Sequence, residues 1–388
     1  MIRLNISLFA FTATLIALLP KAAAQTCNAT FLCPSTAPCC SEYGYCGTDG
    51  YCLGGCEPLY SHEVTSCRPD PICTSFKTDF TDLSRVQQNV SLYDGNATAY
   101  DWVVNTGSLI ASSDNDGARL ILTQNNTGSK ISSTRYLHYG TIDFTLQTSK
   151  WAGVVTAAIT MSDVKDEIDW EWPGANTDTV QTNYWFLGIA NYSATEGASS
   201  SVSSDTAAHF HTYTIDWQES YISWSIDGLL VRTVRKTDTI SEDGTQYKFP
   251  STPSRVQISI WPAGTDGNAQ GTIDWAGGYI DWTDNDYLSK GYFWNTIKSV
   301  NISCAYDTAS SGATGWAYSG NDTSGIPVSP TISFSFPYYS LSFNRGDDEQ
   351  GKLTRDVDVL SFISDCDHYQ CVNSDLRRKE ENCRSRDQ

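Results

Sequence analysis

Residues 166–172 read Asp166-Glu167-Ile168-Asp169-Trp170-Glu171-Trp172, so acidic side chains alternate with large apolar ones. Successive side chains of a β-strand point to opposite faces of the sheet. The stretch therefore predicts a strand with Glu167, Asp169 and Glu171 on one face and apolar residues on the other. Three carboxyls so close cannot all ionise cheaply, and their pKa values separate into an acid and a base. An edge strand with solvated carboxylates is the alternative, but such strands seldom have two tryptophans behind three acids.

The chain around this strand has the pattern of an all-β domain. From about Thr74 to Ile297, short stretches of alternating apolar and polar residues are separated by turns rich in Gly, Asn and Asp. Asp227-Gly228 marks a hairpin between residues 221–226 and 229–232. This pattern predicts a β-sandwich, for which some two hundred residues is an ordinary size.

The composition is that of an acidic secreted protein. Residues 1–24 have the order of a signal peptide, with Arg3, an apolar core from about Ile6 to Leu19, and Ala22-Ala23-Ala24 before Gln25. The net charge of −19 becomes about −21 once the signal is removed, which opposes binding to nucleic acid or anionic lipid. We expect no membrane span in the mature chain. Seven Asn-x-Ser/Thr sites after the signal favour glycosylation on a secretory route: Asn28, Asn89, Asn96, Asn125, Asn191, Asn301 and Asn321.

The thirteen cysteines divide the chain. Seven lie between Cys27 and Cys56, followed by Cys67 and Cys73, and none occurs again until Cys304. A segment so short buries little core and depends on disulfides, whose connectivity the spacing alone leaves open. Cys56 with Cys67 and Cys366 with Cys371 are candidate pairs, and the odd count leaves at least one thiol unpaired within the chain. Zinc ligation is the poorer interpretation, because no Cys-x₂-Cys pairs with a second such pair or with two histidines. We expect neither a metal nor a cofactor.

The acidic strand resembles the Glu-x-Asp-x-Glu signature of glycoside hydrolase family 16, whose fold is a β-jelly-roll sandwich with a sugar-binding cleft. The resemblance implies that Glu167 is the nucleophile, Glu171 the general acid and base, and Asp169 the residue that holds and tunes the nucleophile. Glutamates four apart on a strand span roughly 13 Å between Cα atoms, so their side chains must lean together. A retaining mechanism requires carboxyls about 5 Å apart, which inward-leaning side chains on a curved strand can approach.

Three further strands are expected to complete the cleft. In residues 255–261, Val and Ile take one face, whereas Arg255, Gln257, Ser259 and Trp261 share the other. A lone tryptophan in a sandwich is usually a core residue. The polar neighbours of Trp261 instead favour a platform for a sugar ring.

The other two segments are assigned by the same alternation. In residues 271–275 we expect a strand that sends Ile273 and Trp275 inward and Thr272 and Asp274 toward the cleft. In residues 181–185, Gln181, Asn183 and Trp185 share a face, but parity does not say which one. His211 is interpreted as a structural histidine with satisfied hydrogen bonds.

The N-terminal cysteine segment resembles the hevein-type chitin-binding module. The adjacent pair Cys39-Cys40, followed by Ser-x-aromatic-Gly-aromatic-Cys at residues 41–46, carries this resemblance. It implies disulfides between Cys27 and Cys40, Cys33 and Cys46, and Cys39 and Cys52. It also implies that four residues bind N-acetylglucosamine units: Ser41, Tyr43, Tyr45 and Tyr51. An alternative is that these tyrosines only cover a minimal core.

The span from Cys27 to about Ile297 is similar to the fungal Crh-type chitin transglycosylases. The motifs that carry this similarity are residues 166–172, 180–184, 255–264 and 271–278. Such proteins cleave chitin and join the new end to β-1,3- or β-1,6-glucan. The resemblance implies that Glu171, Gln257, Trp261 and Thr272 contact chitin, and we add Gln181 and Asn183 as candidate substrate contacts. Relatives usually have Arg where this chain has Gln257, so a charged contact is absent here.

We therefore expect a signal peptide over 1–24, a chitin-binding module and linker over 25–73, a jelly-roll catalytic domain over 74–298 and an unassigned extension over 299–388. The extension has a charged tail without the apolar stretch of a lipid-anchor signal. The expected protein is a secreted or cell-wall monomer that acts on chitin and β-glucan. Two alternatives are an endo-hydrolase of chitin or β-glucan and a non-catalytic chitin-binding wall protein.

Overall fold

The computed structural model describes residues 25–189, 197–306, 314–318 and 331–333. All of these described residues belong to one compact unit. The expected signal peptide and the candidate pair Cys366 and Cys371 lie outside the described residues, as do the sequons at Asn191 and Asn321.

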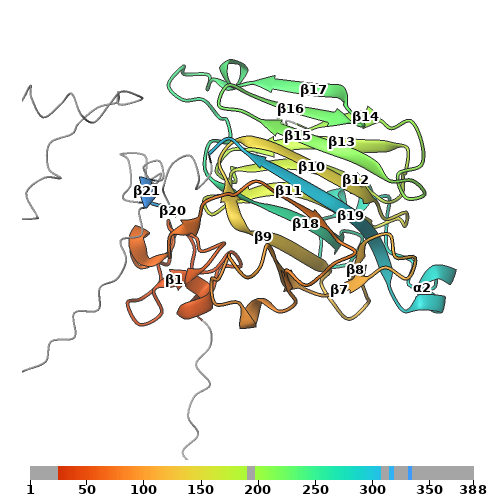
Figure 1. The fold of residues 1–388 in the computed structure, drawn as a ribbon, viewed down its shortest axis with the longest axis horizontal. Helices are drawn as coiled ribbons and strands as arrows, with labels where there is room; N and C mark the ends of the chain where they lie inside the picture. The colour runs from red at the N-terminus through yellow and green to blue at the C-terminus, as the bar shows by residue number, and fades with distance from the viewer. Residues whose placement is uncertain (1–24, 190–196, 307–313, 319–330, 334–388) are drawn as a thin grey trace, which may run out of the picture. The chain divides into compact units, whose positions relative to one another are not determined.

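Two large, mainly antiparallel sheets form the main part of the molecule, and they confirm the predicted jelly-roll sandwich (Figure 1). The first sheet has the order β17 (Leu229–Arg235), β16 (Tyr221–Ile226), β15 (His211–Trp217), β10 (Gly140–Gln147), β19 (Phe293–Cys304), β8 (Ala118–Leu122) and β7 (Leu109–Ala111), and β4 (Phe76–Asp79) also pairs with β19. The second sheet has the order β14 (Ala198–Ser201), β13 (Thr179–Trp185), β12 (Glu167–Pro173), β11 (Val154–Ser162), β18 (Ser254–Pro262), β9 (Ser129–Leu137), β6 (Trp102–Thr106) and β5 (Val86–Gln87).

The core lies between these sheets and is rich in aromatic side chains. Trp170 and Trp172 of β12 are buried there and stack on each other, with ring centroids 6.1 Å apart. Tyr213 of the facing sheet meets Trp172 edge to face at 4.6 Å, a favoured geometry for aromatic pairs. Trp224 of β16 donates its indole N–H to the backbone carbonyl of Asp169 at 3.1 Å. The apolar residues of the alternating stretch thus hold β12 in place through the core, on the face opposite the three acids.

The N-terminal module is small and held together by disulfides. It contains Cys27–Cys40, Cys33–Cys46, Cys39–Cys52 and Cys56–Cys67, the pairs expected from the sequence. Its regular elements are short: β1 (Cys39–Cys40), β2 (Cys46–Gly47), and the 3₁₀ turns η1 (Asp49–Cys52) and η2 (Val64–Ser66). A fifth disulfide, which the sequence did not predict, joins Cys73 to Cys304 at the end of β19.

The structure also shows how the module continues into the sandwich. β19 runs on to Cys304, past the domain end expected at residue 298. Beyond it, β20 (Gly315–Ala317) pairs with β3 (Asp70–Pro71) and with β21 (Thr331–Ser333). Part of the expected extension therefore pairs with the segment that links the module to the sandwich.

The remaining elements are short. They are the 3₁₀ turns η3 (Val90–Leu92) and η5 (Lys236–Thr239) and the helices α1 (Gln270–Trp275) and α2 (Asn285–Lys290). Within the described ranges, no helix has the length and apolar character needed to cross a membrane.

Candidate active site

The strand β12 carries the three acids as the alternation predicted. Glu167, Asp169 and Glu171 lie on the face away from the core, while Ile168, Trp170 and Trp172 are buried behind them. Asp169 is only 2% exposed, whereas Glu167 and Glu171 are half-buried. Asp169 is hydrogen-bonded to Glu167. The three carboxyls thus form one row on the sheet.

A fourth acid in the same stretch has a structural environment. Asp166 is buried and accepts hydrogen bonds from the N–H groups of Leu187, Ser251 and Thr252 and from the Thr252 hydroxyl, at 2.7 to 3.0 Å. These contacts join three segments at the start of β12. Asp166 therefore positions the strand rather than facing the cleft.

The pairing of β13 with β12 shows which face of the sheet Gln181, Asn183 and Trp185 occupy, a point that the sequence left open. Its residues Trp185, Asn183 and Gln181 stand opposite Glu167, Asp169 and Glu171 in the pairing register. They consequently share the face of the acids. The polar groups of Gln181 and Asn183 lie beside the carboxyls, as a substrate-binding role requires.

These strands form the floor of a cleft of about 800 Å³, a size typical of ligand sites. Two tryptophans stand beside it: Trp261 at the end of β18 and Trp275 from α1 stack with ring centroids 6.0 Å apart. Trp275 donates its indole N–H to Gln181 Oε1 at 2.8 Å. The cleft is lined by Glu167, Asp169, Glu171, Gln181, Thr182, Asn183, Trp185, Gly197, Ala198, Ser199, Trp261, Ala269, Gly271, Thr272 and Trp275.

The prediction of a strand over residues 271–275 was wrong, because this segment forms the helix α1. Thr272 still lines the cleft and Ile273 is buried, as expected. Trp275 faces the cleft instead of the core, and Asp274 bonds to Gln270 within the helix. A six-residue helix contains too little of the 3.6-residue period to be told from an alternating strand.

Gln257 has a different environment from the one expected. It lies on the sheet face that carries the acids, but it is only 3% exposed and does not line the cleft. Gln257 stands opposite Ser132 of β9, with Arg255 two residues before Gln257 on β18 and Lys130 two residues before Ser132 on β9. Both side chains donate to Glu42 of the N-terminal module, at 3.2 and 3.1 Å. The module thus lies against the sheet on either side of Gln257.

Burial raises the pKa values of all three carboxyls in the row. Burial raises the pKa of Asp169 well above its usual range, and the charges of Glu167 and Glu171 raise it further, which favours the protonated form of Asp169. Burial raises the pKa of Glu167 to about 7, although the hydrogen bond from Asp169 and the charges of Lys165 and Lys130 offset part of the rise. Burial and the charge of Glu167 raise the pKa of Glu171. The pKa values of the two glutamates are raised to a similar extent, so one of them can be ionised while the other keeps its proton. The hydrogen bond from Asp169 favours the charge on Glu167, which would leave Glu171 as the acid.

The remaining predicted residues lie in the module and on the first sheet. Tyr43, Tyr45 and Tyr51 are 53%, 44% and 44% exposed, which leaves them accessible to a glycan. The Ser41 hydroxyl accepts the Tyr45 N–H at 3.2 Å. His211 is buried and bonded to Asp227 at 2.7 Å and Ser204 at 2.9 Å, in agreement with a structural role.

The sequence is similar to a known family and to several known proteins. Residues 96–277 match the family described as glycosyl hydrolases family 16. The chain is 41% identical over 299 residues to Congo red hypersensitive protein 2 of Saccharomyces cerevisiae, covering 76% of this chain and 63% of that protein. It is 43% identical over 321 residues to Crh-like protein 2 of Aspergillus fumigatus, covering 80% and 69%.

A solved structure is also similar. The Crh5 transglycosylase in complex with NAG aligns with a TM-score of 0.57 at 30% identity, covering 72% of this chain and 100% of that one. The alignments with the curated relatives that share 41–44% identity cover 63–69% of their length.

Proposed function

The chain belongs to glycosyl hydrolase family 16 and, within it, to the Crh-like proteins, and from this premise we propose that it is a retaining transglycosylase that cleaves chitin and transfers it to β-1,3- or β-1,6-glucan. The observation that carries this proposal is the row of Glu167, Asp169 and Glu171 in a cleft beside a stacked tryptophan pair. A solved relative with NAG bound supports an N-acetylglucosamine polymer as donor. By the same reasoning the protein acts outside the cell, at the fungal wall.

In the first half-reaction, Glu171 donates its proton to the glycosidic oxygen that leaves. Glu167 attacks the anomeric carbon through an oxocarbenium-like transition state and forms a glycosyl ester. Asp169 donates a hydrogen bond to Glu167 and so stabilises its ionised form before the attack. Trp261 offers an aromatic face for a sugar ring, while Thr272, Gln181 and Asn183 lie where they can bond to hydroxyl or acetamido groups.

In the second half-reaction, Glu171 acts as a base. It takes the proton of an acceptor hydroxyl, whose oxygen attacks the anomeric carbon and releases Glu167. Water at about 55 M competes for the same carbon, but bound groups can reach effective molarities of roughly 10⁵ M or more. An oriented glucan can therefore outcompete water.

The test combines chitin oligosaccharides with fluorescent laminari-oligosaccharide and compares the wild type with Glu167→Gln by mass spectrometry of the labelled pool. Labelled chitin–glucan hybrids from the wild type alone are the expected result. Shortened chitin without hybrids would reduce the function to hydrolysis. No reaction with retained binding to chitin would favour a binding protein.

We also propose that the module binds chitin through Ser41, Tyr43, Tyr45 and Tyr51. The three exposed tyrosines on a disulfide-linked scaffold support this role. A triple Tyr→Ala variant of the full chain should be retained less on chitin beads than the wild type. Equal retention would assign the binding to the cleft.

A further inference from the structure

The N-terminal module is attached to the sheet of the active site by polar contacts that are largely buried. Glu42 accepts from Lys130 of β9 and Arg255 of β18, and the side chains of these three residues are 13%, 21% and 6% exposed. Burial would raise the pKa of Glu42, but Arg255 and Lys130 lower it to about 2. The carboxylate therefore stays ionised between its two cations. Removing one member of such a group would leave a buried charge without its partner.

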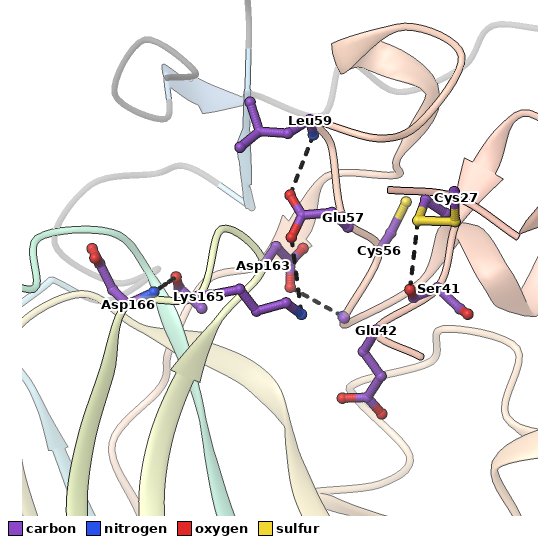
Figure 2. Close-up of polar contacts among 12 residues, drawn as sticks. Cys27, Ser41, Glu42, Cys56, Glu57, Leu59, Asp163, Lys165 and Asp166 are labelled. Carbon is purple, nitrogen blue, oxygen red and sulfur yellow. Dashed lines mark hydrogen bonds and ion pairs between the residues drawn. A yellow bond between two sulfur atoms is a disulfide. The ribbon is translucent and has the colours of Figure 1, made fainter. Parts of the chain in front are cut away.

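Three more contacts continue this interface. The N–H of Gly55 donates to Tyr136 at 2.8 Å and to Asp163 at 3.1 Å. Lys165 extends toward Glu57, with 3.9 Å between Nζ and Oε2, and the other oxygen of Glu57 accepts the Leu59 N–H (Figure 2). With Cys73 bonded to Cys304 at the end of the linker, the module has a fixed position on the sandwich.

The strand register shows how close this module lies to the carboxyls. Glu171 of β12 stands opposite Ala157 of β11, Ala157 opposite Ser259 of β18, and Ser259 opposite Lys130 of β9. All four face away from the core, because their chain neighbours Trp170, Ala158, Ile258 and Ile131 are core residues. Three strand spacings of about 4.8 Å separate the ends of this row, or roughly 14 Å.

The side chains between the two ends of this row are small, and the row ends beside an aromatic residue of the module. Ala157 and Ser259 are small, and Ser259 is partly exposed. At the far end, Lys130 Nζ lies 5.1 Å from the ring centroid of Tyr43. The Tyr43 side chain is 53% exposed. A short run of sugar rings that starts at Glu171 can therefore pass over Ser259 and reach Tyr43.

We propose that the module is a fixed extension of the cleft, in which Tyr43 and Lys130 form a subsite for an N-acetylglucosamine unit of the chain bound at Glu171. This inference rests on the proposed function only in taking chitin as the donor. The Tyr43 ring offers an apolar face for stacking. The Lys130 ammonium has three donors, of which Glu42 accepts one, so it can also donate to a hydroxyl or an acetamido oxygen. One donor chain then occupies the module and the cleft together.

Calorimetric titration of the full chain carrying Glu167→Gln tests this proposal with chitin oligosaccharides of increasing length. Short oligomers should bind two per chain, at the module and in the cleft. Oligomers long enough to span both should bind one per chain with a step up in affinity. Adding Tyr43→Ala should weaken the long oligomers roughly fivefold to tenfold and leave cleft binding of the short ones unchanged.

The matched control is Tyr247→Ala, which removes another exposed tyrosine next to a lysine, Lys236, outside the module and the cleft. It should change neither the stoichiometry nor the step. Two long oligomers per chain, or a step that persists in Tyr43→Ala, would overturn the shared subsite while leaving the proposed reaction intact. If Trp261→Ala leaves cleft binding of short oligomers unaffected, the proposed chitin donor site itself is wrong.

Discussion

The environment of Asp169 predicts that this residue is protonated and donates to Glu167, and replacing Asp169 tests that prediction. In Asp169→Ala the hydrogen bond to Glu167 is lost. A hydrogen bond to a charged group contributes about 1.5–3 kcal/mol, and one pKa unit corresponds to about 1.36 kcal/mol. Because Asp169 is only 2% exposed, solvent cannot readily replace this bond. The pKa of Glu167 should therefore rise by roughly one to two units.

The assay is the pH dependence of kcat/KM with a chitin oligosaccharide donor, which reports the ionisations of the free enzyme. The acidic limb reflects protonation of Glu167, so it should move upward in Asp169→Ala. At a pH on that limb the rate should fall roughly tenfold to a hundredfold. Circular dichroism in the near ultraviolet would check that the fold is retained.

The control is Asp169→Asn, which keeps the size of the side chain and an N–H donor for Glu167. If Asp169 is neutral in the wild type, the acidic limb of this variant should stay close to its original position. Two results would refute a protonated Asp169 that donates to Glu167. The acidic limb could shift as far in Asp169→Asn as in Asp169→Ala, or it could stay in place in Asp169→Ala.

Three further outcomes are expected. Burial raises the pKa values of both Glu167 and Glu171 above the usual 4.5, so the plot of kcat/KM against pH should be bell-shaped, with both limbs above that value. The rate should fall on the acidic side when Glu167 gains a proton and on the alkaline side when Glu171 loses one. Trp275→Ala removes the ring that stacks on Trp261 and the donor to Gln181, and should raise KM for chitin oligosaccharides about tenfold, whereas Trp275→Phe should recover part of this loss. Replacing both Cys73 and Cys304 by Ser opens a loop with a sequence separation of 231, and the chain-entropy treatment predicts that the free energy of unfolding falls by roughly 5 kcal/mol. Replacing Cys56 and Cys67, whose separation is 11, should lower it by only roughly 3 kcal/mol. Unfolding in denaturant would show whether the first pair has the larger effect.

Several elements could be predicted from the sequence because their signals are local. The alternation of residues 166–172 determines which side chains share a face, and β12 follows it. The same parity placed Val256, Ile258 and Ile260 of β18 in the core. The segment 271–275 shows the limit of this reasoning, since an alternating pattern and a single helical turn can have the same residues at the same positions.

The sequence by itself determined the sandwich class and the row of three acids, because a two-residue period fixes sides without any knowledge of partners. Which strands lie beside that row, and on which side, was decided only by tertiary pairing: Gln181 faces the cleft across from Glu171, whereas Gln257 is buried next to the module. The bond between Cys73 and Cys304 and the ion pairs of Glu42 likewise join residues far apart in the chain. Such contacts depend on distances that the folded chain creates, and no local pattern of residues encodes them.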